Sequence, residues 1–251
     1  RRSWAYDELF AFQSVIAKRV VDRRAGERAP KALPRTLQSR LLRELPFSLT
    51  RDQKTVLEEI VDDLGSARPM ARLLQGDVGS GKTLVAFLSA LPYVELGYQV
   101  AFVAPTELLA RQHAQNAAAL LEPLGVRLAL LSGAVESPAR APMLDAIAEG
   151  SVDIVVGTHA VFTDRVSFHD LRLVIIDEQH RFGVQQRQAL AAKGNDADVL
   201  LMTATPIPRT LALTVFGDME TSIIRTMPPG RKPVRTHLAK QENEHKVYER
   251  V

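Results

Sequence analysis

Short apolar runs alternate with longer amphipathic segments from about residue 46 onward. The apolar runs predict strands and lie at 73–74, 100–103, 128–131, 154–156, 171–176 and 199–202. The amphipathic segments predict helices near 51–64, 82–96, 107–122, 140–149, 183–193 and 208–215. Strands that alternate with helices favour a parallel sheet. Because Leu173-Val174-Ile175-Ile176 is apolar at every position, it is typical of a strand covered on both faces. The pattern predicts an α/β fold, a mostly parallel sheet with helices on both faces.

The residues before Pro46 follow a different pattern. Apolar side chains at spacings of three and four predict a helix over 3–24, namely Leu9, Phe12, Ile16 and Val20. Gly26, Pro30 and Pro34 then predict a linker, and a short helix is expected over 36–44. We therefore expect residues 1–45 to form a helical connector that precedes one α/β domain over 46–227.

A break in composition follows at Pro228-Pro229-Gly230. Beyond it, residues 234–238 favour a strand and residues 244–251 favour a helix, so we expect 228–251 to begin a second unit. The chain also starts with Arg1 and not with Met. For both reasons we expect a fragment of a longer protein.

The composition is that of an ordinary globular protein. Hydrophobic residues make up 46% and charged residues 24% of the 251 positions, which argues against a disordered or fibrous chain. There is no cysteine, which excludes disulfide frameworks, thiolate zinc sites and cysteine nucleophiles. No apolar run approaches the roughly 18 residues of a membrane span. We expect a cytoplasmic protein without a membrane partner.

The net charge of +3 is unevenly distributed along the chain. Between Lys18 and Arg43 there are nine basic and two acidic residues, a local balance of +7. Such a segment favours a polyanion as its partner. A solvated helix–linker–helix rich in arginine would have the same composition, so both interpretations stay open.

The residues from Gly76 to Thr83 have the pattern of a phosphate-binding loop. All eight are candidate nucleotide ligands: Gly76, Asp77, Val78, Gly79, Ser80, Gly81, Lys82 and Thr83. Glycines allow several backbone N–H groups to point at phosphate oxygens beside a helix N-terminus. The Lys82 ammonium would then meet the β and γ phosphates of a nucleotide, and the Thr83 hydroxyl would bind Mg²⁺.

A second motif follows the apolar run that ends at Ile176. It contains two adjacent carboxylates, Asp177 and Glu178. Because open α/β sheets bind ligands at the carboxyl ends of their strands, this pair is expected near the phosphate loop. Asp177 would hold Mg²⁺, usually through water, and Glu178 would polarise the attacking water.

A third motif contains Thr203 and Thr205, after another apolar run. Their hydroxyls could bridge Glu178 or His180 to neighbouring groups. Thr205 could instead cap a helix whose first turn contains Pro208, and the two roles are compatible.

Four histidines show no metal-ligand spacing and are expected at the surface: His113, His169, His237 and His245.

Taken in order, the phosphate loop, Asp177-Glu178-Gln179-His180 and Thr203-Ala204-Thr205 resemble the first RecA-like lobe of superfamily-two helicases. Longer stretches are similar to the RecG family of bacterial DNA-branch helicases, with a likeness from about residue 5 to the end; they include 45–53, 104–110, 177–184 and 203–211. Transcription-repair coupling factors have similar motifs, but they usually carry Glu at the place of Gln179. The resemblance implies a RecA-like P-loop NTPase lobe.

The resemblance also implies roles for individual residues. Phe47 and Gln53 would lie beside the adenine of ATP. Catalytic roles fall to Lys82, Asp177, Glu178 and His180, and coupling roles to Gln179, Thr203 and Thr205. Contacts with a DNA backbone are expected from Pro105, Thr106, Arg111, Thr158 and His159. Loop capping is an alternative for the last two.

The family as a whole implies an enzyme that uses magnesium-ATP to move on branched or forked DNA, such as stalled forks and Holliday junctions, in recombination and repair. A second helicase lobe and a wedge domain are expected as further parts, with the basic segment as the connector to the wedge. The second lobe's arginine pattern, Gln-x-x-Gly-Arg-x-Gly-Arg, does not occur in this chain, so the chain alone is expected to be nearly inactive. Two alternatives stay open: a translocase that couples transcription to repair, and a regulatory ATPase that does not move on DNA.

Overall fold

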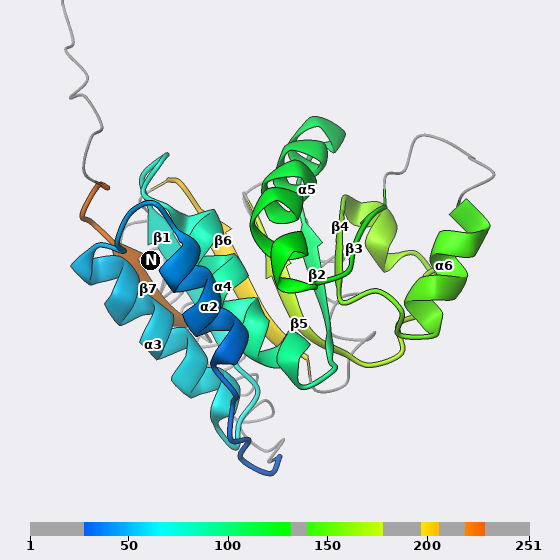
Figure 1. Ribbon diagram of the computed structural model, residues 1–251, viewed down its shortest axis with the longest axis horizontal. Helices are drawn as coiled ribbons and strands as arrows, with labels where there is room; N and C mark the ends of the chain where they lie inside the picture. The colour runs from blue at the N-terminus through cyan, green and yellow to red at the C-terminus, as the bar shows by residue number, and fades with distance from the viewer. Residues whose placement is uncertain (1–27, 132–139, 178–196, 206–218, 229–251) are drawn as a thin grey trace, which may run out of the picture.

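A computed structural model of the chain describes residues 28–131, 140–177, 197–205 and 219–228 (Figure 1). The helices expected over 3–24, 183–193 and 208–215 lie outside these ranges, as do the elements expected after residue 228. Within the described ranges, none of the helices has both the length and the apolar character needed to cross a membrane.

Seven strands form one sheet in the order β3-β4-β2-β5-β6-β1-β7. Their bounds are β1 Ala71–Gly76, β2 Gln99–Val103, β3 Leu128–Leu131, β4 Ile154–Gly157, β5 Leu171–Ile176, β6 Asp198–Thr203 and β7 Glu220–Ile224. Every neighbouring pair is parallel. The parallel α/β sheet is thus confirmed, and six of its strands coincide with the predicted apolar runs. The seventh strand, β7, was not predicted.

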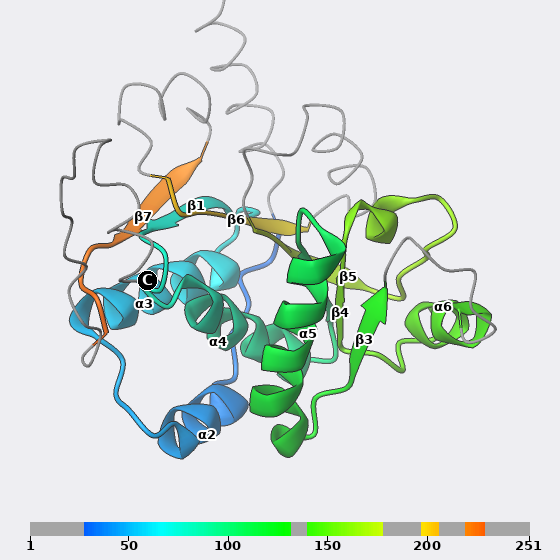
Figure 2. The ribbon, with the colours of Figure 1, turned by 90° about the horizontal axis from the view of Figure 1, so that it is seen from above.

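The described helices are α2 Thr36–Glu44, α3 Arg51–Gly65, α4 Lys82–Glu95, α5 Glu107–Leu121 and α6 Arg140–Ala148, with short 3₁₀ turns η1 Glu122–Leu124 and η2 His159–Phe162. Figure 2 shows α3, α4 and α5 on one side of the sheet, while α6 lies beyond the β3–β4 end. Helices α3 to α6 agree with the amphipathic segments that predicted them, and α2 agrees with the short helix expected over 36–44.

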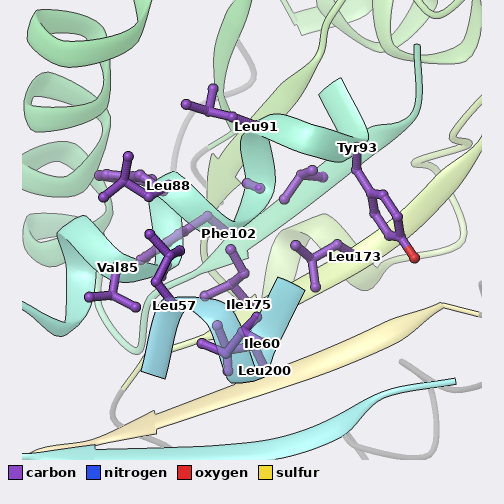
Figure 3. Close-up of a cluster of buried hydrophobic side chains, with 14 of the residues drawn as sticks. Leu57, Ile60, Val85, Leu88, Leu91, Tyr93, Phe102, Leu173, Ile175 and Leu200 are labelled. Atoms are coloured by element: carbon purple, nitrogen blue, oxygen red, sulfur yellow. The ribbon is translucent and has the colours of Figure 1, made fainter. Parts of the chain in front are cut away.

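Two hydrophobic clusters bury the two faces of the sheet. The larger one packs Ile60 of α3 and Leu88 of α4 against Phe102 and Ile175 of the strands (Figure 3). The second gathers strand residues that point the other way, together with α6 and η2; it includes Leu73, Val103, Val155, Val174, Ile176, Leu201, Ile147 and Phe162. Since successive strand residues point to opposite faces, burial of both faces explains why the central runs are apolar at every position.

Helix α2, which lies within the expected connector, packs against α4. Leu41 of α2 belongs to the larger hydrophobic cluster. The buried Gln38 side chain donates a hydrogen bond from Nε2 to the Leu88 carbonyl, at 3.1 Å. That carbonyl has no intrahelical donor four residues on, because Pro92 carries no N–H. The connector therefore completes the hydrogen bonding of a helix in the α/β domain.

The connector residues that precede α2 are anchored by a buried ion pair. Arg28 donates to both carboxylate oxygens of Asp198, at 2.8 and 3.0 Å. The Tyr93 hydroxyl and the Met70 N–H also donate to this carboxylate. Burial, and then the Asp198 charge, raise the pKa of Tyr93, so the hydroxyl keeps its proton as a donor. The carboxylate therefore ties the connector to strands β1 and β6.

Other basic residues of the same segment are also paired. Arg35 contacts Glu58 at 2.6 Å and Arg40 contacts Glu44 at 2.9 Å. Much of the described basic charge is therefore neutralised within the chain. This favours the connector interpretation over a free polyanion-binding arm for residues 28–43, while residues 18–27 lie outside the described ranges.

Candidate functional site

The carboxyl ends of the parallel strands bring the predicted motifs to one edge of the sheet. In β1 and β6, Gln75 pairs with Thr203. In β2, Val103 pairs with Gly157 of β4 and with Ile176 of β5. The phosphate loop, the third motif and the second motif therefore follow three adjacent strands, β1, β6 and β5. Ligands bind at this edge in open α/β sheets.

The loop between β1 and α4 has the backbone of a phosphate cradle. Gly79 and Gly81 have φ angles of 78° and 88°, in the left-handed region that glycine adopts without a steric penalty. Gly81 is the N-cap of α4 and has no side chain to accept hydrogen bonds from the first turn. The first N–H groups of a helix lack intrahelical acceptors, so an anion fits there.

The side chains of the loop suit the same ligand. The Ser80 hydroxyl is buried and has no hydrogen-bond partner among the described residues. Lys82 Nζ donates to the carbonyls of Gly76 and Asp77, at 2.7 and 3.1 Å. Its ammonium thus lies over the loop, where it would neutralise phosphate charge. The residues present therefore fit the polyphosphate of a nucleotide.

Asp177 lies directly after β5, and its N–H donates to the Val103 carbonyl at 2.8 Å. Its side chain is within 2.8 Å of His113, Oδ2 to Nε2. The described residues hold no cluster of three or more His, Cys, Asp or Glu side chains that could bind a metal. Mg²⁺ in proteins usually keeps several waters and is bound by one or two carboxylates together with substrate phosphates, so Asp177 and Thr83 could hold it together with a nucleotide.

His113 was expected at the surface, and this prediction is wrong. The residue is 7% exposed and Asp177 is 9% exposed. His113 lies on the inner face of α5 with Ala110, Ala117 and Leu121, which recur at spacings of three and four. This apolar stripe was the signal that could have placed the histidine inside the protein.

The third motif is held together by its own hydroxyls. Thr203 Oγ1 and Thr205 Oγ1 are 2.9 Å apart, and the Thr205 N–H donates to Thr203 Oγ1 at 3.2 Å. Their expected partners Glu178 and His180 lie outside the described residues, as does Gln179. The helix that Thr205 was expected to cap also lies outside them.

The residues expected beside adenine differ in exposure. Phe47 is 48% exposed, whereas Gln53 is only 2% exposed. Gln53 forms a capping box with Thr50 at the start of α3, and its Nε2 donates to the Ser80 carbonyl at 2.7 Å. The amide is thus a structural support of the phosphate loop, a contact that no local pattern indicated.

Asp52, next to Gln53, holds the chain that leaves β7. Its carboxylate accepts hydrogen bonds from the Arg225 N–H and from both the N–H and the hydroxyl of Thr226. These bonds hold the pKa of Asp52 below its ordinary value, and the bond from the Thr226 N–H has the largest effect. The start of α3 is therefore tied to both the phosphate loop and the end of the sheet.

The two segments expected to contact DNA lie side by side at the same edge. The Ala104 N–H donates to the Gly157 carbonyl at 2.8 Å, so the residues after β2 and β4 are adjacent; they include Pro105, Thr106, Thr158 and His159. Thr106 caps α5 by accepting the Leu109 N–H. Arg111 and His159 are exposed, whereas Thr158 is 3% exposed. Thr158 therefore differs from Arg111 and His159, because its side chain is not accessible to a ligand from solvent.

Comparisons with known proteins agree with this geometry. The chain is 53% identical to the ATP-dependent DNA helicase RecG of Treponema pallidum (strain Nichols), over all of this chain and 40% of the relative. It is 48% identical to the RecG of Bacillus subtilis (strain 168), over 96% of this chain and 36% of the relative. A solved structure of RecG bound to a three-way DNA junction superposes with a TM-score of 0.85 and 42% identity, over 97% of this chain and 33% of that one.

The chain thus spans about 40% or less of the length of these relatives. The expected resemblance to RecG helicases is confirmed, and so is the RecA-like fold. The family model described as DEAD/DEAH box helicase matches residues 50–214, more than half of the chain. That range holds the phosphate loop, Asp177 and Thr203, and the chain therefore belongs to the DEAD/DEAH box helicase family.

Proposed function

We propose that this chain forms the first motor lobe of an ATP-dependent DNA helicase that remodels branched DNA in recombination and repair. The observation that carries the proposal is the match over 97% of the chain to a RecG structure bound to a three-way DNA junction. The matched range includes the phosphate loop and Asp177 on neighbouring parts of the sheet edge. A transcription-coupled translocase or a purely regulatory ATPase has no comparable support.

Magnesium-ATP is the proposed cofactor of the lobe. The backbone N–H groups of the loop and the Lys82 ammonium would hold the phosphates, while Thr83 and Asp177 would hold Mg²⁺. Bound Mg²⁺ would neutralise charge on the β and γ phosphates. Glu178 is the proposed group that orients the attacking water, and His180 is a further proposed catalytic residue. Gln179, Thr203 and Thr205 would couple the site to movement.

The proposed DNA contacts lie at the same edge, beyond Asp177. Pro105, Thr106 and Arg111 would meet one stretch of backbone, and His159 would meet the next. For Thr158, whose side chain is buried, the backbone is the more suitable contact. Sugar–phosphate contacts of this kind position a protein on DNA without reading its sequence.

The rest of the proposed assembly lies beyond this chain. A second helicase lobe would supply arginines to the ATP site, and a wedge domain would meet the DNA branch, with residues 1–45 as the connector. A DNA substrate and a chain without cysteine support a cytoplasmic location.

Replacing Lys82 with Ala tests the nucleotide site. The substitution removes the charge that faces the phosphates, so calorimetric titration with magnesium-ATP is expected to show weak or no binding. Arg68→Ala serves as the control, because Arg68 is an exposed cation outside the loop and should leave the affinity unchanged. Equal affinities of wild type and Lys82→Ala would contradict the proposed site.

A further inference from the structure

We propose that His113 is a positioning residue that orients the Asp177 carboxylate for Mg²⁺. The inference rests on the proposed function, because it concerns the metal of the ATP site. Nothing in the helicase motifs assigns a role to this histidine, which lies on α5 and not on a strand end.

The histidine ring is fixed from two directions. Its Nε2 lies 2.8 Å from Asp177 Oδ2. Its plane packs against the buried Phe102 of β2, with ring centroids 4.8 Å apart and an angle of 50° between the planes. Helix α5 also holds the backbone of the residue, because Ala117 and Leu121 on the same face are buried against the sheet. The ring therefore has little freedom to turn away from the carboxylate.

The hydrogen bond has a defined direction. An ionised carboxylate can only accept hydrogen bonds, so Nε2 carries the hydrogen and donates it to Oδ2. In that form Nδ1 is a bare acceptor. Nδ1 is buried and has no hydrogen-bond partner among the residues that the structure describes. The Asp177 carboxylate thus requires a hydrogen on Nε2.

This donor limits the rotation of the Asp177 side chain. With Oδ2 engaged, the carboxylate plane is set by α5 and β5 together. Mg²⁺ requires a nearly ideal octahedral arrangement of its ligands. A carboxylate that binds it directly or through water therefore binds more tightly when its orientation is already fixed. Outer partners of metal ligands have this effect in other sites, where their removal typically lowers metal affinity by about 10- to 100-fold.

The test measures how binding of a fluorescent ATP analogue to the 251-residue chain depends on the Mg²⁺ concentration. His113→Leu removes the donor and keeps an apolar side chain in the core. His113→Gln places an amide N–H near the position of Nε2, and His113→Asn carries an amide that is too short to reach Asp177. Leu121→Ala is the matched control, because it loosens the same face of α5 without touching Asp177. Affinity in EDTA and the melting temperature are measured for each variant.

A positioning role predicts that His113→Leu and His113→Asn raise the Mg²⁺ concentration at half-maximal binding by roughly 10-fold. The affinity in EDTA should stay unchanged, and His113→Gln should resemble wild type. Leu121→Ala should lower the melting temperature and leave the Mg²⁺ dependence as it is. If His113→Leu does not fold, the comparison of Gln with Asn decides.

Three results would overturn the inference: equal Mg²⁺ dependence of the Asn variant and wild type, a Gln variant as impaired as Asn, or the same shift in Leu121→Ala. A wild-type chain that binds no nucleotide at any Mg²⁺ concentration is a different result. It would overturn the proposed function itself, and the positioning role with it.

Discussion

At the scale of single residues, Gln53 connects two parts of the site that lie 27 positions apart in the sequence. Its Oε1 accepts the Thr50 N–H at the start of α3, and its Nε2 donates to the Ser80 carbonyl in the phosphate loop. An amide has two N–H hydrogens and two carbonyl lone pairs. These two bonds use one of each, so the same side chain has the capacity to pair with the edge of a base.

Replacing Gln53 with Ala is expected to weaken the preference for ATP over GTP. Adenine offers the donor and acceptor that an amide can pair with, whereas guanine presents the reverse arrangement. A site built for such hydrogen bonds rejects the wrong base, because its polar groups are left unpaired. Competition of GTP with a labelled ATP measures this preference, and GTP should compete poorly in wild type and better in the variant. If the variant loses affinity for both nucleotides by the same factor, Gln53 supports the loop and does not read the base.

The sequence predicted those site residues whose role depends on local backbone. Gly79 and Gly81 were predictable, since a phosphate loop needs positive φ at fixed positions. Two other contacts depend on how distant elements pack. One is the hydrogen bond from Gln53 to Ser80, and the other joins His113 to Asp177, 64 positions apart in the sequence. For such pairs the sequence pattern can predict that a residue is buried, but it cannot predict which residue it contacts.

At the scale of elements, α4 depends on α2 for its hydrogen bonding. Pro92 leaves the Leu88 carbonyl without its usual donor, and the buried Gln38 of α2 supplies one. A buried carbonyl without a partner costs about 1–3 kcal/mol. The polar residue in an otherwise apolar contact therefore stabilises the attachment of the connector to the lobe.

A double-mutant cycle tests this dependence. Gln38→Leu should lower the free energy of unfolding by about 1–3 kcal/mol, measured by chemical denaturation. In a Pro92→Ala background the same change should cost less, because the alanine N–H supplies the missing donor to Leu88. The difference between the two costs is the coupling energy of the pair. Strictly additive effects would show that Gln38 acts through packing alone.

Helices and strands were predictable where their burial required a recognisable pattern of apolar residues in the sequence. Strands β2 and β5 are buried on both faces, and their apolar runs over 100–103 and 173–176 indicated both their positions and their parallel pairing. Strand β7 lies at the edge of the sheet and buries only Ser222 and Ile224 of its five residues. Its sequence, Glu-Thr-Ser-Ile-Ile, has no apolar run of sufficient length, so no strand was predicted there.

At the scale of the whole molecule, the described part of the basic segment serves to attach the connector. Arg28 is buried in its bonds to Asp198 and to the Leu64 and Ser66 carbonyls, and Lys31 lies 4.3 Å from the ring centroid of Tyr98. Composition alone could not separate attachment from polyanion binding, since both require clustered cations. Two of the ion-pair partners, Asp198 and Glu58, are acidic residues of the α/β domain. These pairs favour attachment over polyanion binding for Arg28 and Arg35.

The proposed division of the ATP site between two lobes predicts the activity of the chain by itself. Phosphoryl transfer requires neutralisation of charge on the γ-phosphate, and an arginine finger typically contributes about 10³ to 10⁵ in rate. Of the proposed ATP site, this chain would supply Lys82, Thr83 and Asp177, while the arginine pattern expected of a second lobe does not occur in its sequence. Movement also requires a cleft between two lobes that closes on ATP and reopens. Purified residues 1–251 are therefore expected to bind magnesium-ATP but to hydrolyse it very slowly, with little stimulation by a model DNA fork and no unwinding. The measurement compares ATP turnover with and without the fork, for this chain and for a longer chain that includes the next lobe.

Rapid, fork-stimulated turnover by residues 1–251 alone would show that one lobe holds a complete site, and the two-lobe mechanism would then be wrong.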